Sequence, residues 1–235
     1  MCHILCSSKQ IGKFHKIKNK RCEDAVSAKQ YPFGTVMAVS DGVGSKRYAR
    51  IGANAAVNAV QKSFCDFSEN IVEFEGVPER IKEYYMGAIS PKKLTQADAT
   101  CLFAAHIYER GLYLGQIGDG LVICQSKKEV VMMRESKSGF SNFVTPLNWK
   151  TEKDQWRLKF IPEHELNQVF IALMTDGISE EIMPEKETAF ANRLIEKLNG
   201  KEKQNTILRS MLRQEIAPYS IDDKALAVYA IQKEN

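Results

Sequence analysis

The sequence predicts an α+β fold in which antiparallel β-sheets form the interior and helices pack outside them. Strand-like and helical segments follow one another in the order strands, two helices, strands, two helices, strand. Most successive strands are joined by short links, which suit antiparallel neighbours. The 235 residues are an ordinary length for one sandwich domain, so we expect a single domain over residues 1–235.

The first predicted elements are a strand, a glycine-rich acidic turn and two helices. The segment from Gly34 to Ser40 is short, apolar and rich in β-branched residues, which indicates a buried strand. Beyond the turn, apolar residues recur at helical steps, at Ala49, Ala53, Ala56, Val57, Val60 and Phe64. A second helix is expected to begin near Pro78 and to end at Ser90-Pro91.

The middle of the chain reads as strands joined by tight turns. The period becomes strand-like from Ala99 onward, which predicts an antiparallel meander made of the segments 100–108, 112–117, 121–125 and 130–134. In the polar stretch from Glu135 to Asp154, apolar residues follow neither the helical nor the strand-like spacing. We expect it to be a long surface loop, of the kind that often serves as a lid or a binding element.

The last third repeats the pattern with two strands, two amphipathic helices and one strand. Strands are predicted at 156–161 and 169–174, and helices at 187–198 and 202–216 with Asn199-Gly200 as the stop between them. The final strand is expected at 224–231.

Composition indicates a globular protein of the cytoplasm. The hydrophobic share is 44% and the charged share 26%, and the net charge is only +4. Six cysteines without C-x-x-C spacing indicate reduced thiols rather than a zinc ribbon or a disulfide framework. No signal peptide or membrane-length apolar segment is apparent, so we expect cytoplasmic residence and no membrane contact.

Basic residues cluster near the start of the chain, at Lys9, Lys13, Lys16, Lys18, Lys20 and Arg21. Such a cluster is either a solvated face or an attraction for an anionic substrate. It lacks the aromatic interleaving that stacks bases, so we expect no nucleic-acid partner.

Four acidic residues recur in one setting, at the end of an apolar, strand-like run and beside Gly or Asp. They are Asp41, Asp119, Asp176 and Asp222, and Glu23-Asp24 adds a further acidic pair. One Asp-Gly after an apolar run is usually a β-turn, but the recurrence indicates a site for a hard divalent cation such as Mg²⁺ or Mn²⁺.

A pair of such cations supports phosphoester hydrolysis, because it lowers the pKa of a bridging water and neutralises developing charge. Asp41 is our choice for the shared ligand, with the Gly42 carbonyl coordinating as well. Asp176 and Asp222 are expected on one metal, and Asp24, with Glu23 as a further candidate, on the other.

Six motifs in order resemble those of the PP2C-type, metal-dependent protein Ser/Thr phosphatases, and in particular a compact bacterial branch. They are Cys22-Glu23-Asp24-Ala25, Val39-Ser40-Asp41-Gly42-Val43-Gly44-Ser45, Ala97-Asp98-Ala99-Thr100-Cys101-Leu102, Ile117-Gly118-Asp119-Gly120, Met174-Thr175-Asp176-Gly177 and Ile221-Asp222-Asp223-Lys224, preceded by Gly12-Lys13-Phe14-His15. The resemblance extends from about Gly12 to Ile231.

The resemblance implies a four-layer αββα sandwich, with two central antiparallel sheets flanked by pairs of helices and a Mg²⁺ or Mn²⁺ pair at one end. It implies the same ligands, Asp41, Gly42, Asp176, Asp222 and Asp24, and Asp119 for a third, weaker metal. It also implies direct attack on phosphorus by metal-bridging hydroxide, without a phosphorylated enzyme residue.

Two points of the resemblance leave residue roles open. Asn19 stands where the family has its phosphate-binding Arg, so Lys18, Lys20 and Arg21 are candidate replacements. His15 is a candidate general acid or phosphate contact, or else a structural histidine.

The leading interpretation is a monomeric phosphatase that acts on phosphoserine or phosphothreonine and opposes a Ser/Thr kinase, its partner being that kinase or its target. A catalytically silent relative that binds a partner is one alternative, and retention of every expected acidic ligand argues against it. The other is a hydrolase of small phosphoesters; no P-loop is present to favour a nucleotide.

Overall fold

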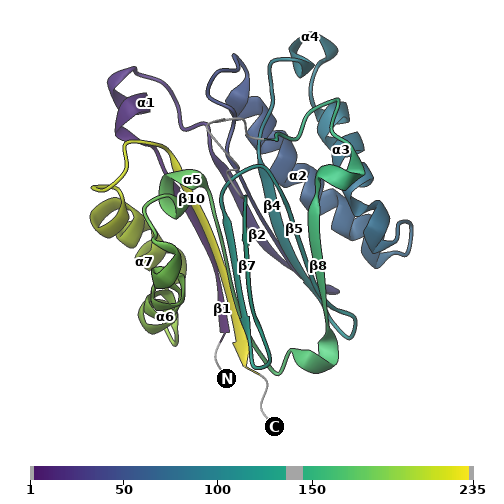
Figure 1. Cartoon of the computed structure of the whole chain (residues 1–235), viewed down its shortest axis with the longest axis vertical. Helices are drawn as coiled ribbons and strands as arrows, with labels where there is room; N and C mark the ends of the chain where they lie inside the picture. The colour runs from purple at the N-terminus through teal and green to yellow at the C-terminus, as the bar shows by residue number, and fades with distance from the viewer. Residues whose placement is uncertain (1–2, 136–144, 233–235) are drawn as a thin grey trace.

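Two five-stranded antiparallel sheets lie face to face at the centre of the molecule (Figure 1). The computed structural model describes residues 3–135 and 145–232. The first sheet has the order β1 (His3–Gln10), β10 (Lys224–Gln232), β9 (Gln168–Met174), β6 (Leu121–Ser126) and β7 (Val130–Arg134). The second has the order β2 (Ala25–Tyr31), β3 (Gly34–Ser40), β4 (Cys101–Ile107), β5 (Gly111–Ile117) and β8 (Arg157–Pro162).

Helices cover the outer face of each sheet and complete a four-layer sandwich (Figure 1). The helices α2 (Ala49–Ser68) and α3 (Val77–Ala88) cover the second sheet, with the short α4 (Pro91–Leu94) after them. The first sheet is covered by α6 (Glu187–Leu198) and by α7 (Gln204–Met211), which continues as a π-helical turn over Leu212–Ile216. Two single-turn helices, α1 (Lys13–Ile17) and α5 (Asp176–Ser179), lie at one end of the sandwich.

The core consists of three apolar layers, one between each pair of neighbouring structural layers. On β3, Val36 and Ala38 pack toward the helices, whereas Met37 and Val39 pack toward the other sheet. The same alternation holds on β9. Because both faces of each central strand are covered, those strands are apolar throughout instead of alternating with polar residues.

Most of the predicted elements are confirmed to within one or two residues. The helix expected at 187–198 is α6, and the strand expected at 130–134 is β7. The helix expected at 202–216 is α7 with its π-helical continuation. No helix in the described part of the chain is long and apolar enough to cross a bilayer.

The predicted four-stranded meander is wrong in one respect, because the chain changes sheet in its middle. Strands β4 and β5 belong to the second sheet, whereas β6 and β7 belong to the first. The turn Gly118-Asp119-Gly120 therefore crosses from one sheet to the other.

Strands β1 and β2 were not expected. Each forms an edge of its sheet, and each carries exposed or half-buried polar residues such as Lys9, Gln10 and Lys29. Polar edges protect sheets from pairing with other chains. The apolar periodicity that reveals a buried strand is correspondingly weak in both.

The expected surface loop at 135–154 lies partly outside the described residues, which resume at Thr145. Leu147 is fully buried, and its backbone exchanges hydrogen bonds of 2.7 and 3.3 Å with that of Ala99. A 3-10 turn follows at Lys153–Gln155. The described end of this segment is thus anchored beside the start of β4.

Candidate metal centre

Three acidic residues meet at one end of the sandwich, between the two sheets. Asp41 follows β3, Asp119 lies in the turn between β5 and β6, and Asp176 follows β9. One carboxylate oxygen from each lies within 4.8 Å of the others. The strand register brings them together, because Leu121 pairs with Met174 and, through β4, the ends of β3 and β5 lie at the same edge.

Asp24 joins this group from the start of β2, where Ala25 pairs with Ser40. Only 1% of the residue is exposed. Its Oδ2 accepts a hydrogen bond of 2.7 Å from the Thr175 hydroxyl, and its side chain is within hydrogen-bonding reach of that of Asp41. Its buried Oδ1 has no donor among the described residues.

Burial and mutual repulsion hold these carboxyls far from their ordinary protonation state. Burial, with Asp223 and Asp222 adding to it, raises the pKa of Asp24 to about 7. Burial and then Asp119 raise the pKa of Asp176 to about 8. The pKa of Asp41 is also raised well above its usual value, first by burial and then by Asp24.

This electrostatic arrangement suits a divalent cation. Within the described residues, Asp24, Asp41 and Asp176 form no ion pair with a basic side chain. Buried charges without a partner are costly, and a bound cation removes that cost. Carboxylate oxygens are the donors that Mg²⁺ and Mn²⁺ prefer, so the residues present fit the expected metals.

Two glycines allow the backbone around these carboxylates to pack closely. A Cβ on Gly42 would lie 2.4 Å from the carbonyl oxygen of Ala49, at the start of α2. A Cβ on Gly177 would lie 1.9 Å from the carbonyl oxygen of Asp223. Only glycine permits these approaches, which place the Asp41 and Asp176 turns against their neighbours.

Asp223 ties the N-terminal segment to the last acidic turn. Its Oδ1 accepts a hydrogen bond of 2.7 Å from the Gly12 amide, and its Oδ2 accepts one of 2.5 Å from the Glu23 amide. The same Oδ2 lies 2.7 Å from Nδ1 of His15. Asp223 itself is 2% exposed, so this contact is an internal one.

Lys224 stabilises the acidic turn at 222–223 through hydrogen bonds to its backbone. It is 1% exposed, and its Nζ donates hydrogen bonds of 2.9 Å to the Ser220 carbonyl and 2.6 Å to the Asp222 carbonyl. Desolvation lowers the pKa of this lysine. Asp222, in contrast, is exposed, and it lies near enough to Asp24 and Asp176 to raise the pKa of both.

His15 and Glu23 lie beside the acidic group and contact one another. His15 is 7% exposed, and its Nε2 lies 3.4 Å from Oε2 of Glu23. The other Glu23 oxygen, Oε1, lies 3.6 Å from Nζ of Lys20. Both ring nitrogens of His15 therefore face carboxylates.

The basic residues proposed for phosphate contact lie on the surface. Lys18, Lys20 and Arg21 are all exposed. The Nζ of Lys18 lies 3.8 Å from the centroid of the Phe14 ring. None of the three is among the residues that line the pocket described next.

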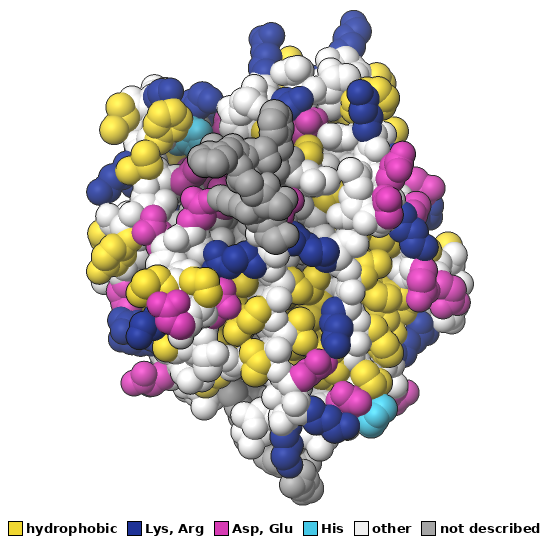
Figure 2. Space-filling model, in the orientation of Figure 1, with side chains coloured by type: hydrophobic (Ala, Val, Ile, Leu, Met, Phe, Trp, Pro, Cys, Tyr) yellow, Lys and Arg dark blue, Asp and Glu magenta, His cyan; other side chains and the backbone are white. Residues whose placement is uncertain are grey.

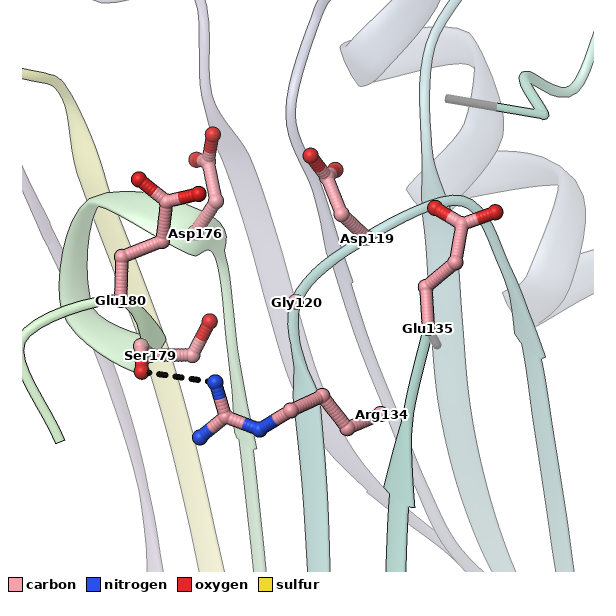
Figure 3. Close-up of a pocket in the computed structure, with 7 residues that line it drawn as sticks. All are labelled: Asp119, Gly120, Arg134, Glu135, Asp176, Ser179 and Glu180. Carbon is pink, nitrogen blue, oxygen red and sulfur yellow. Dashed lines mark hydrogen bonds between the residues drawn. The ribbon is translucent and has the colours of Figure 1, made fainter. Parts of the chain in front are cut away.

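A pocket of about 500 Å³ opens beside Asp119 and Asp176. Figure 3 shows both carboxylates directed to the same side, with Glu180 and Glu135 at the margins. Arg134 points away from them, toward Ser179 (Figure 3). Its guanidinium donates to the Ser179 and Ile182 carbonyls and to Glu187, and thereby holds the C-terminal end of α5.

Several supporting residues were not identified from the sequence. Thr175 orients Asp24 and accepts a hydrogen bond of 2.9 Å from the Ala225 amide. The Thr100 hydroxyl accepts one of 2.9 Å from the Asp41 amide. Adjacency to a motif Asp was the available signal for Thr175 and Lys224, whereas Arg134 carried none, because its partners are defined only by the fold.

The family model described as protein phosphatase 2C matches residues 11–215. No curated protein sequence matches the chain.

Solved bacterial phosphatases share the fold at low sequence identity. The Mycobacterium tuberculosis serine/threonine phosphatase PstP/Ppp is 12% identical with a TM-score of 0.67, the match covering 99% of this chain and 100% of that one. The Staphylococcus aureus serine/threonine phosphatase Stp1 is 12% identical with a TM-score of 0.65, over 98% and 96% of the two chains. RsbX in complex with magnesium is 14% identical with a TM-score of 0.61, again over 98% and 96%. The extent of the family match, together with this fold, shows that the chain belongs to the protein phosphatase 2C family.

Proposed function

We propose that this chain is a metal-dependent protein phosphatase that hydrolyses phosphoserine and phosphothreonine. The observation that carries the proposal is the convergence of Asp24, Asp41, Asp119 and Asp176 between the sheets. A fully buried carboxylate, Asp24, grouped with three half-buried ones is energetically costly and is expected where a cation offsets the cost. Family membership supports a phosphoester as the substrate.

The proposed ligands divide between two Mg²⁺ or Mn²⁺ ions. Asp41 is the ligand shared by both ions, and the Gly42 carbonyl lies beside it. Asp24 is a ligand of the second ion. The close approach of the Asp24 and Asp41 side chains supports adjacent positions for these two ligands.

Asp176 and Asp222 are further ligands of the first ion, and Asp119 is a ligand for a third, more weakly bound ion. The grouping of Asp119 with Asp41 and Asp176 supports its inclusion. Glu23 is a weaker candidate, because its two oxygens face His15 and Lys20.

When bound, the metal pair supplies an acidified water and neutralises charge on the phosphoryl group. The contribution of the chain is to hold the ligands in place. Thr175 fixes the orientation of the Asp24 carboxylate, and Thr100 fixes the backbone at Asp41. Such outer contacts orient metal ligands and tune their basicity.

His15 is better suited to positioning than to proton transfer. Its Nδ1 contacts Asp223 and its Nε2 faces Glu23, and the residue is 7% exposed. A general acid must reach the leaving oxygen of the substrate. Asp223, which contacts Nδ1 of His15, also accepts hydrogen bonds from the Gly12 and Glu23 amides, so His15 contributes to holding this segment in place.

The proposed partner is a phosphoprotein, either a Ser/Thr kinase or the target of one, and the chain is expected to act as a monomer. The five cysteines in the described part of the chain are free thiols. Free thiols suit a reducing compartment, so we propose that the substrate is encountered in the cytoplasm.

The deciding experiment is hydrolysis of a phosphothreonine peptide by chelator-stripped protein, with and without added Mn²⁺ or Mg²⁺. We expect turnover only when metal is added. The turnover rate of the Asp176→Asn variant should be lower by about 100-fold or more, because the variant binds the metal less tightly. Asp154→Asn is the matched control, because Asp154 is exposed and lies outside the acidic group. It should retain wild-type turnover.

Calorimetric titration with Mn²⁺ separates the alternatives. Metal binding by the wild type without turnover of any phosphoester would favour a silent binding module. Turnover of p-nitrophenyl phosphate but not of the phosphopeptide would favour a small-molecule phosphoesterase.

A further inference from the structure

The segment 13–21 is a strongly basic part of the surface. It contains five cations and no carboxylate, at Lys13, Lys16, Lys18, Lys20 and Arg21. Since the whole chain has 33 cations and 29 carboxylates, the remainder without this segment carries 28 cations against 29 carboxylates. The net positive charge of the protein is therefore located in these nine residues.

Four of these five cations have no ionic partner in the described structure. Lys20 lies 3.6 Å from Glu23, and the other four make no ion pair there. All five side chains are exposed. Their field is available to a ligand that approaches from solvent.

Large apolar side chains lie among these cations. Ile17 is 86% exposed and Phe14 is 45% exposed, both on α1. Ile221, which is 65% exposed, adjoins them, because its carbonyl accepts a hydrogen bond of 3.1 Å from the Phe14 amide. Figure 2 shows basic and hydrophobic side chains gathered over α1, beside acidic ones. We refer to residues 13–21 together with Ile221 as the α1 lobe.

The α1 lobe adjoins the acidic turn at 222–223, because Nδ1 of His15 lies 2.7 Å from Oδ2 of Asp223. Asp223 accepts hydrogen bonds from the Gly12 and Glu23 amides, immediately before the lobe and two residues after it. Asp24 follows directly and is one of the converging carboxylates. A peptide whose phosphorylated residue lies at the metals would therefore have its flanking residues within reach of the lobe.

We infer that the α1 lobe is a substrate-docking surface for an acidic segment that flanks the phosphorylated Ser or Thr and carries an apolar side chain. This inference rests on the function proposed above. Charge complementarity identifies the occupant, because four cations without an ionic partner in the described structure select anionic partners and repel basic ones. The apolar side chain of the substrate packs against Ile17 and Phe14.

An anionic membrane surface is the other partner class that cations and apolar residues attract. Helix α1 has only five residues and presents two apolar side chains. Interfacial membrane helices bury a large apolar face opposite a strongly polar one. The geometry thus favours a peptide segment.

The test compares two phosphothreonine peptides that differ only in their flanks, one with Asp, Glu and Leu and the other with Gln at the same positions. The variant carries Lys13→Gln and Lys16→Gln, which leave the phosphate-contact candidates Lys18, Lys20 and Arg21 and the Lys20–Glu23 pair intact. The matched control carries Lys197→Gln and Lys201→Gln, two exposed lysines outside the lobe with the same change in net charge.

For the acidic peptide we expect kcat/KM to fall about fivefold in the lobe variant, mainly through a higher KM, because two exposed charge contacts are lost. The neutral peptide and p-nitrophenyl phosphate should change by less than about twofold, and added salt should reduce the preference of the wild type for the acidic peptide. The control variant should behave as the wild type. Ile17→Ser should lower kcat/KM for the acidic peptide only when that peptide carries its Leu.

Three results would overturn the inference. An equal loss on p-nitrophenyl phosphate would mean that the lysines act on the phosphoryl group itself. No loss on the acidic peptide would mean that the lobe is only a solvated face. Loss of binding to phosphatidylserine vesicles, with unchanged peptide kinetics, would assign it to a membrane.

Fluorescence anisotropy of the labelled acidic peptide tests docking without turnover. Tighter binding of the acidic peptide by the wild type than by the lobe variant supports docking even if no phosphoester is hydrolysed. In that case the proposed activity fails and the docking surface stands.

Discussion

Individual side chains at the metal centre are held by partners that lie far away in the sequence. Asp223 accepts hydrogen bonds from Gly12 and Glu23 and contacts His15, across about 200 residues of chain. A carboxylate is suited to this position because both of its oxygens accept. An Asn would turn an amide group toward one of these donors.

The first prediction concerns this contact. Asp223→Asn should weaken Mn²⁺ binding about tenfold, because the N-terminal ligand segment loses its anchor. His15→Ala should weaken it in the same direction. His15→Asn should restore much of the affinity, since the Asn amide can donate from the position of ring Nδ1. Titration calorimetry with Mn²⁺ measures all three.

The pH–rate profiles distinguish positioning from acid catalysis at His15. If His15→Asn binds Mn²⁺ normally but loses kcat and the basic limb of the wild-type profile, His15 is a proton donor and the positioning role is wrong.

A second residue-scale prediction concerns Thr175. Its hydroxyl donates to Asp24 and accepts from the Ala225 amide, both buried. Thr175→Val keeps the shape but leaves both partners unsatisfied, so unfolding of the metal-free protein in urea should show a loss of about 1–3 kcal/mol. Thr175→Ser retains the hydroxyl and should recover most of that loss. Equal stability of the Val and Ser variants would contradict this role.

At the scale of elements, the short helix α5 depends on its close approach to the turn at 222–223. A Cβ at Gly177 would lie 1.9 Å from the carbonyl oxygen of Asp223. Gly177→Ala should therefore destabilise the protein by about 1–3 kcal/mol through overpacking, and it should weaken metal binding because Asp176 is displaced with the helix.

Gly87→Ala is the control for that substitution. Gly87 lies in α3, and a Cβ there would meet nothing within 4 Å. The change should be neutral or stabilising by up to about 1 kcal/mol, from the higher helix propensity of Ala. Thermal unfolding and Mn²⁺ titration of the two variants give the comparison. Similar behaviour of both would show that close packing at Gly177 has no special importance.

For the whole molecule, the acidic centre makes stability depend on pH. The raised pKa values of Asp24, about 7, and Asp176, about 8, lie above the ordinary value of 3.8. At pH values between the ordinary pKa and these raised ones, the metal-free folded protein binds more protons than the unfolded chain does. The free energy of unfolding of the metal-free protein should therefore fall as pH rises from about 4 through about 8.

Bound metal should reverse the fall of the free energy of unfolding with rising pH, because the cation displaces the protons from the aspartates. Mn²⁺ should raise the melting temperature more at pH 8 than at pH 6, and calorimetry in buffers of different ionisation enthalpy should detect proton release on binding. Asp176→Asn should flatten the pH dependence of the metal-free protein. If the stability of the metal-free protein rises with pH, the raised pKa values of Asp24 and Asp176 are not the cause of the pH dependence.

Much of the candidate site could be predicted from local patterns. Asp41, Asp119 and Asp176 each follow a strand-like apolar run, and the structure groups all three at one end of the sandwich. The buried central strands were identified because their apolar runs are continuous. Helix α6 was located by its 3.6-residue period and the Asn199-Gly200 stop.

Edge strands and long-range contacts could not be predicted in this way. Strands β1 and β2 carry polar residues on open edges, which hides their period. Lys224 looks like any surface lysine beside two aspartates, yet it is 1% exposed and bound to two carbonyls. No local pattern distinguishes a buried cation of this kind from a solvated one.

By itself, the sequence determined the residue types, the order of the elements and the placement of acidic turns after apolar strands, because these depend on local periodicity and turn chemistry. Only the tertiary structure decided that the chain changes sheet at Asp119, that Asp24 meets Asp41, and that Asp223 holds the N-terminal segment. Those contacts join residues far apart in the chain. They form only when burial of both faces of two sheets selects one arrangement of the strands.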